Sequence, residues 1–336
     1  MTELLPDPEL IGMATARIFD ITKRLSFWPF LSTLLITGFV FYRHVGRRRA
    51  NLRRFLSYLF PATVWRHRSA LVDVKVTIVS IITSPLRKSL LGLSVPIAAA
   101  AFAYGLNQWL GPPATQFGDS FASIALLAAT IFLLTDFSVY LIHYIGHHWE
   151  PLWAFHRVHH SAERLNPITV ARSHPVYDIL AKITEIIFVA PVQGAVLFFW
   201  PQQAGLAVLF GVAIVYGVFS LAGANLRHSH VWFSFGRFER FFVSPAQHQI
   251  HHSKAEEHWD RNFGGVLAIW DWMFGTLVMA PSKRQKLEFG LSSGETHNGI
   301  VEAMVEPFVY AHNAITHPDN RNRSKAEQAL IGERPR

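Results

Sequence analysis

The chain contains no cysteine and few charged residues. The absence of cysteine from its 336 residues excludes disulfides, zinc–thiolate sites, iron–sulfur clusters and cysteine nucleophiles. Charged residues make up 16% of the sequence, whereas soluble domains average about a quarter. Half of the residues are hydrophobic, and the mean hydropathy is +0.22. These values favour one membrane domain with polar extensions over two soluble domains.

Several common motifs are missing as well. The sequence has no internal repeat, no glycine-rich phosphate loop followed by a helix, and no flavin, haem or iron–sulfur motif. The first 24 residues carry acidic side chains and no uninterrupted apolar core, so we expect no cleavable signal peptide.

Long apolar runs predict five membrane crossings. The third run is interrupted by Asp136, and the turn Pro201-Gln202-Gln203 joins the last two into a hairpin. The shorter run 74–84 is interpreted as interfacial or re-entrant, because a helix rises only about 1.5 Å per residue. The expected crossings are residues 25–42, 89–110, 121–144, 186–200 and 204–223.

The net charge of +8 is explained by topology. Six arginines lie just after the first expected crossing, which places them in the cytoplasm by the positive-inside rule. With five crossings, all but three of the 31 Lys and Arg residues then fall on the cytoplasmic side, the exceptions being Arg17, Lys23 and Arg24. We therefore expect an integral, multi-pass membrane protein and no nucleic-acid partner.

Eight of the 18 histidines lie in three short boxes. Residues at positions i, i+3 and i+4 of a helix share one face, so each box offers two or three imidazoles to one centre. Ser244-Pro245 is typical of an N-cap and first residue of a helix that carries the third box. Eight imidazoles exceed the needs of one ion and indicate two metal ions. The boxes are His143 and His147, then His156, His159 and His160, then His248, His251 and His252.

Asp136 lies seven residues before His143, on the same helix face and inside an expected crossing. Acidic residues within a membrane span are functional candidates. We expect Asp136 to belong to the catalytic site, although an interfacial or capping aspartate fits the position too.

These residues resemble the fatty acid hydroxylase and sterol desaturase superfamily of membrane di-iron enzymes. The resemblance runs from about Asp136 to Thr276 and includes the three boxes together with Asn262-Phe263-Gly264-Gly265. It also includes Arg172-Ser173-His174-Pro175 and Trp270-Asp271-Trp272-Met273-Phe274-Gly275-Thr276, which make it specific. The chain departs from the family pattern at Tyr144, where arginine is common, and at Tyr177, where an acid is common.

The resemblance implies two further metal ligands, His174 and His228, with His230 as an alternative to His228. It also places Asn262 and Asp271 near the site, where we expect them to orient ligands. His148, His230 and His258 are otherwise interpreted as structural residues or as residues that support the ligands from outside.

The implied activity is O2-dependent hydroxylation or desaturation of an unactivated C–H bond of a lipid, such as a sterol or fatty acyl chain, with hydroxylation favoured. The resemblance implies two iron ions, and electrons from a separate cytochrome b5- or ferredoxin-like protein. The boxes follow the cytoplasmic ends of the expected crossings, so the metal site should face the cytoplasm. A metal transporter and a zinc-dependent hydrolase are the competing functions.

The expected fold is all-α: a multi-pass membrane helical bundle with a cytosolic, histidine-rich helical cap. We expect an N-terminal segment at 1–24, membrane spans and a basic cytosolic loop at 25–120, and the catalytic domain at 121–280. A polar extension with a disordered tail follows at 281–336.

Overall fold

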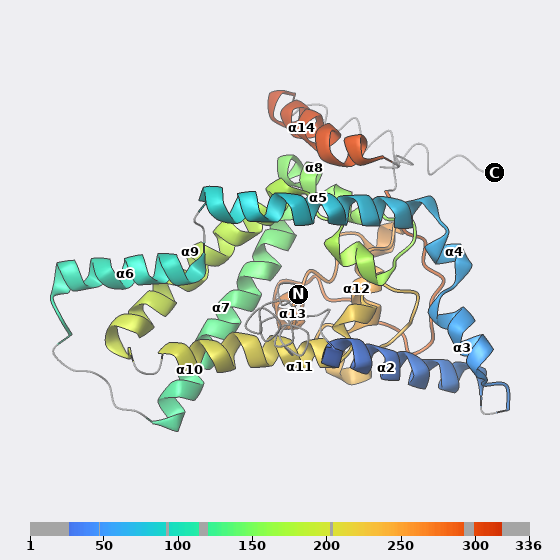
Figure 1. The fold of residues 1–336 in the computed structure, drawn as a ribbon, viewed down its shortest axis with the longest axis horizontal. Coiled ribbons are helices and arrows are strands. Elements are labelled where there is room, and N and C mark those ends of the chain that lie inside the picture. The colour runs from blue at the N-terminus through green and yellow to red at the C-terminus, as the bar shows by residue number, and fades with distance from the viewer. Residues whose placement is uncertain are drawn as a thin grey trace, which may run out of the picture.

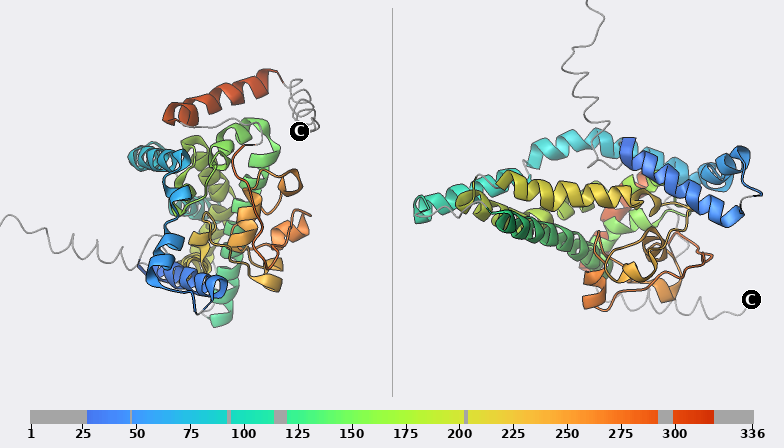
Figure 2. Two further views of the ribbon diagram at one scale, coloured as in Figure 1. Left: turned by 90° about the vertical axis from the view of Figure 1, so that its right-hand side faces the viewer. Right: turned by 90° about the horizontal axis from the view of Figure 1, so that it is seen from below.

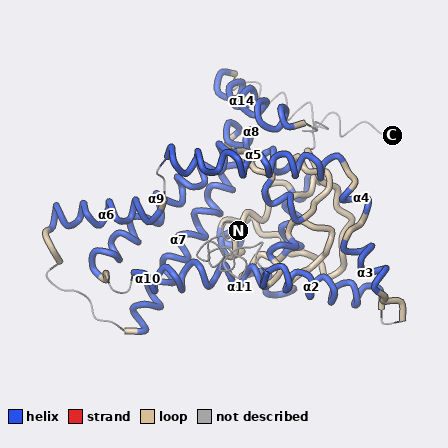
Figure 3. The backbone as a smooth tube through the Cα atoms, viewed as in Figure 1, coloured by secondary structure: helices blue, strands red, loops and turns tan. Residues whose placement is uncertain are grey.

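The computed structural model describes residues 27–46, 48–91, 94–113, 120–201, 204–291 and 299–317. The expected N-terminal segment 1–24 lies outside these ranges, as does the expected disordered tail from about Asn313 except for its first residues, which are helical up to Thr316. Within these ranges the structure contains helices, loops and two isolated β-bridges but no strand (Figure 3). The all-α prediction is therefore confirmed for the described residues.

In Figures 1 and 3, α6 (Val95–Leu110), α7 (Phe121–His148) and α9 (Pro175–Phe199) extend to the left, and most of the loops gather to the right. There α5 (Arg68–Leu91) runs above the loops and α2 (Phe27–Val45) below them. The α-helices are α2 Phe27–Val45, α3 Leu52–Leu59, α4 Ala62–Trp65, α5 Arg68–Leu91, α6 Val95–Leu110, α7 Phe121–His148, α8 Glu150–His160, α9 Pro175–Phe199, α10 Ala204–Val208, α11 Val215–Leu221, α12 Pro245–His251, α13 Ile269–Met273 and α14 Ile300–Thr316. The 3-10 helices are η1 Pro167–Ala171, η3 Ala224–Leu226, η4 Gly236–Arg240 and η5 Glu256–His258, and η2 Leu209–Ile214 is a π-helix.

An apolar core holds α6, α7, α9 and α10 together. Ile131 of α7 and Val189 of α9 lie at its centre and are almost fully buried. Two glycines allow the helices to approach closely. A Cβ at Gly194 would lie 2.7 Å from the carbonyl oxygen of Ala99, and one at Gly211 would lie 2.3 Å from that of Ala128. Small residues at helix crossings serve this purpose in membrane bundles.

Two helices, α7 and α9, are each long and apolar enough to cross a membrane. The five-crossing bundle therefore stays a prediction. The expected crossing 89–110 is divided between the end of α5 and α6, and the run 74–84 lies inside the 24-residue α5. The last expected crossing, 204–223, is built from α10, η2 and α11.

The C-terminal helix α14 was not anticipated by the sequence analysis, which treated 281–336 as a polar extension. Its buried residues Ala303, Pro307 and Ala311 face the molecule, and α14 packs on α8 and α5 (Figures 1 and 2). The helix covers α8, which carries the second histidine box, on the side away from α12.

Candidate metal centre

Three helices bring the histidine boxes together. α7 ends with the first box, α8 carries the second, and α12 carries the third. Helix α12 begins as predicted: Ser244 is the N-cap, Pro245 follows it, and the Ser244 and Gln247 side chains form a capping box. Glu239 supports this start, because its carboxylate accepts a hydrogen bond from Ser244 Oγ at 2.6 Å.

Nine of the ten predicted ligands form two groups, in each of which the candidate ligand atoms lie within 4.8 Å of one another. Each box contributes to the first group, and the second and third boxes and His228 form the second. The first group is His143, His147, His156, His160 and His251; the second is His159, His228, His248 and His252.

The structure does not bring His174 into either group. Its Nδ1 accepts a hydrogen bond from the backbone N–H of Val176 at 3.1 Å, so His174 caps the N-terminus of α9. Its Nε2 lies 3.2 Å from the carbonyl oxygen of Met304 on α14. His230 also makes its contact outside both groups: its Nε2 lies 2.6 Å from the carbonyl oxygen of Tyr58. Of the two alternatives that the resemblance offers, His228 lies in the second group and His230 does not.

Backbone carbonyl groups orient three of the rings. His143 Nδ1 lies 2.8 Å from the oxygen of Phe263, and His251 Nδ1 lies 2.7 Å from that of Arg261. His159 Nδ1 lies 3.1 Å from the oxygen of Arg172. A carbonyl oxygen only accepts hydrogen bonds, so each Nδ1 must carry a proton. In a neutral ring the Nε2 atom is then unprotonated and offers its lone pair.

The Nε2 atoms point toward one another inside each group. His228 Nε2 lies 3.0 Å from both His248 Nε2 and His252 Nε2, and His251 Nε2 lies 3.1 Å from His160 Nε2. His143 Nε2 is buried and has no hydrogen-bond partner. Converging lone pairs repel unless a cation lies between them.

These separations fit a metal ion. Imidazole nitrogens bind such ions at about 2.0–2.1 Å, so two neighbouring ligands at a right angle are about 3.0 Å apart. Burial also keeps the rings neutral, as ligation requires. It lowers the pKa of His159 to about 4, and it lowers the pKa values of His160 and His252 well below the usual range, with neighbouring imidazoles adding to the effect. The residues of both groups therefore fit resident metal ions.

The three predicted polar residues lie beside the centre and bind the segment 262–278. Asp136 accepts hydrogen bonds from the backbone N–H groups of Val266 and Leu267 and from Trp270 Nε1, at 2.7–3.0 Å. It thereby attaches the middle of α7 to the loop that precedes α13.

Asp271 and Asn262 hold the carbonyl groups that orient His143 and His251. Asp271 accepts hydrogen bonds from the backbone N–H of Phe263 at 2.7 Å and of Gly264 at 2.8 Å. Asn262 has φ +57, and its Oδ1 accepts a hydrogen bond from the Val278 N–H at 2.7 Å. Both residues act on the rings through the backbone at positions 261 and 263.

Sequence reasoning missed an acidic residue beside one of the rings. Asp260 Oδ1 lies 3.5 Å from His147 Nδ1. It also missed the three carbonyl acceptors, for which no side-chain pattern gives a signal. His148 and His258 lie outside both groups, as expected.

Comparison with known proteins agrees with this geometry. Residues 128–276 match the fatty acid hydroxylase family model. Human alkylglycerol monooxygenase is 30% identical over 161 residues, which cover 48% of this chain and 32% of the relative. The ornithine lipid hydroxylase OlsE of Rhizobium tropici is 26% identical over 250 residues, which cover 73% of this chain and 64% of the relative.

A putative Delta(7)-sterol-C5(6)-desaturase 2 of Arabidopsis thaliana is 23% identical over 169 residues, covering 48% of this chain and 52% of the relative. The chain thus spans less than two thirds of these curated relatives. No solved structure matches it significantly. The resemblance to the fatty acid hydroxylase and sterol desaturase superfamily is confirmed, and residues 128–276, which match the fatty acid hydroxylase model, carry all nine converging histidines.

Proposed function

We propose that this protein is a membrane-bound, O2-dependent lipid hydroxylase whose two histidine groups each hold one iron ion. The observation that carries the proposal is the pair of groups itself, five and four imidazoles with ligand atoms within 4.8 Å. Two irons held there would supply O2 activation for oxidation of an aliphatic C–H bond. The electrons come from a separate redox protein of the cytochrome b5 or ferredoxin kind.

The chain's own residues prepare the site. The carbonyl oxygens of Arg172, Arg261 and Phe263 fix three rings in the tautomer that leaves Nε2 free. Burial of both groups excludes water and keeps the imidazoles neutral. Helices α7 and α9 are each long and apolar enough to cross a membrane, and α7 ends with the first box. We propose that a lipid chain reaches the site from the membrane at this end of α7.

The relatives suggest the class of substrate. Their names describe action on an alkylglycerol, an ornithine lipid and a sterol, of which the first two carry long aliphatic chains on a polar head. We propose an aliphatic chain of a polar lipid as the substrate, hydroxylation as the reaction, and a site that faces the cytoplasm.

The test combines metal analysis with lipidomics. Protein purified without oxygen should contain about two irons per chain, and cells that express it should accumulate a lipid heavier by one oxygen. The variant His228→Ala should abolish the product, whereas His230→Ala, whose ring contacts Tyr58, should retain it. A lipid lighter by two hydrogens would indicate desaturation instead. Zinc in place of iron, with turnover that does not need O2, would refute the proposal.

A further inference from the structure

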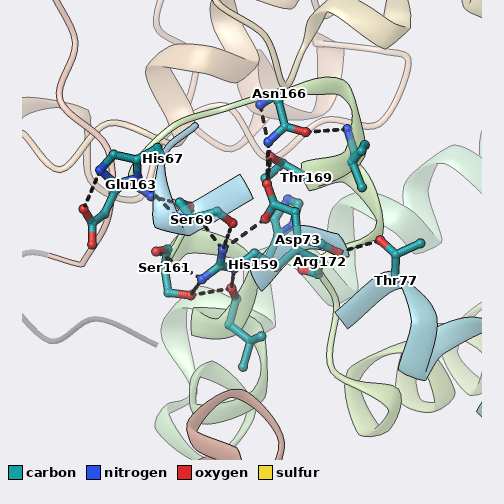
Figure 4. A network of polar contacts seen from close by, with 12 residues as sticks. His67, Ser69, Asp73, Thr77, His159, Ser161, Glu163, Asn166, Thr169 and Arg172 are labelled. Atoms are coloured by element: carbon teal, nitrogen blue, oxygen red, sulfur yellow. Dashed lines mark hydrogen bonds and ion pairs between the residues drawn. The ribbon is translucent and has the colours of Figure 1, made fainter. Parts of the chain in front are cut away.

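A buried polar network connects α5 to the chain that follows the second histidine box (Figure 4). At its centre, Arg172 is 1% exposed and Asp73 is 0% exposed. Arg172 Nη1 lies 3.0 Å from Asp73 Oδ1. The other carboxylate oxygen, Asp73 Oδ2, accepts hydrogen bonds from Thr169 Oγ1 at 2.8 Å and Asn166 Nδ2 at 2.5 Å. Both carboxylate oxygens of Asp73 therefore have hydrogen-bond partners, and this contact holds the Arg172 guanidinium in one orientation.

The rest of the Arg172 side chain binds the C-terminal end of α8. Arg172 Nε donates to the carbonyl oxygen of Val158 at 3.0 Å, and Nη2 donates to Ser161 Oγ at 2.8 Å. The last carbonyl groups of a helix have no donor within the helix, and a cation there is also favoured by the helix dipole. Arg172 thus fixes the helix end from which His159 and His160 project.

The backbone of the same residue orients a metal-ligand candidate. The carbonyl oxygen of Arg172 lies 3.1 Å from His159 Nδ1, and His159 Nε2 lies 3.1 Å from His228 Nε2 in the second group. One residue therefore fixes both the helix end beneath His159 and the rotation of its ring. α5 holds that residue in place through Asp73 and through Ser69, whose Oγ lies 3.2 Å from Arg172 Nη1.

We propose that Asp73 and Arg172 are positioning residues for the second histidine group, with Asp73 acting through Arg172 on His159. Asp73 lies outside residues 128–276, so a helix beyond the matched domain becomes part of the metal centre. The inference rests on the proposed function only in that the second group must bind a metal ion.

The test measures metal binding in the full-length protein and needs no substrate. Metal-free wild type and Asp73→Asn are titrated with Co²⁺, and bound cobalt and its visible absorption spectrum are recorded. Asp73→Asn should retain the ion in the five-histidine group and bind the second ion at least about 10-fold more weakly, as loss of an outer partner does elsewhere. Lys75→Gln, an exposed single-charge change on the same helix, should bind both ions as wild type does.

Arg172→Lys provides a second variant in case Asp73→Asn fails to fold. Lysine keeps a positive charge for Asp73 but cannot reach Val158 and Ser161 at the same time. It should show the same selective loss of the second ion. The inference would be overturned if either folded variant bound two Co²⁺ ions with wild-type affinity and spectrum. It would also be overturned if the variant bound both ions more weakly by the same factor. Wild type that binds two Co²⁺ but oxidises no lipid would refute the proposed function and leave this inference standing.

Discussion

Asn262 offers a sharp test of how the loop between α12 and α13 orients the rings. It is 0% exposed, and its φ of +57 is in the left-handed region that residues other than glycine rarely adopt. Its Oδ1 accepts from the Val278 N–H at 2.7 Å and its Nδ2 donates to the Gln247 carbonyl at 3.2 Å. Asn262→Gly removes both hydrogen bonds and keeps the backbone conformation accessible. Asn262→Ala removes the same bonds and adds backbone strain.

The two variants should differ in a defined order. Leaving a buried donor or acceptor unpaired costs about 1–3 kcal/mol, so two lost bonds predict about 2–6 kcal/mol of destabilisation for Asn262→Gly. A left-handed Ala costs about 1–2 kcal/mol, partly offset by the greater freedom of Gly in the unfolded chain. Asn262→Ala should therefore be less stable than Asn262→Gly by about 1 kcal/mol.

Denaturant unfolding in detergent, with and without metal, measures this order. Because the carbonyls at positions 261 and 263 hold His251 and His143, both variants should also bind the metal of the first group more weakly. Equal stability of the Gly and Ala variants would refute the argument from backbone conformation. Wild-type stability and metal affinity in both would refute the role of the Asn262 side chain altogether.

Two further predictions concern His174 and Asp271. Because asparagine also serves as an N-cap, His174→Asn should retain both metal ions and the stability of α9, and loss of an ion on metal analysis would return His174 to the ligand set. Burial raises the pKa of the Asp271 carboxyl to about 6, so between about pH 4 and pH 6 the folded protein holds a proton that the unfolded chain releases. The unfolding free energy of metal-free wild type relative to Asp271→Asn should fall by about 3 kcal/mol as the pH rises through that window, and a flat difference would contradict the shift.

The sequence predicted which histidines gather, because helical spacing is local, but it did not predict how they divide: the second box gives His156 and His160 to the first group and His159 to the second. Helical spacing of three and four places His156, His159 and His160 on one face, and Ser244-Pro245 starts the helix that carries the third box. Nine of ten predicted ligands consequently converge. His174 differs because its motif is equally compatible with capping a helix that begins at Pro175, and spacing alone does not separate the two roles.

The membrane helices were harder to predict. Apolar composition does not mark where a helix ends: α5 continues beyond the apolar run 74–84 to Leu91, and it does so although Pro85 lies within it. The buried Asp73 near its start was unremarkable in the sequence, since its partner Arg172 lies 99 positions away. An isolated acidic residue in an apolar helix indicates that a polar or basic side chain binds it, but the sequence does not show which one.

Ring orientation depends on contacts that spacing does not encode. The oxygen that holds His251 Nδ1 comes from a residue 10 positions away, the one for His159 from 13 positions away, and the one for His143 from 120 positions away. These acceptors are backbone groups, which every residue possesses, so no residue type reveals them. Their placement relies on side chains that touch no histidine ring: Asp271 and Asn262 for the loop at 261–264, and Asp73 for Arg172. The histidine pattern therefore determines which imidazoles can meet, whereas polar residues elsewhere in the fold determine which nitrogen each imidazole presents to the metal.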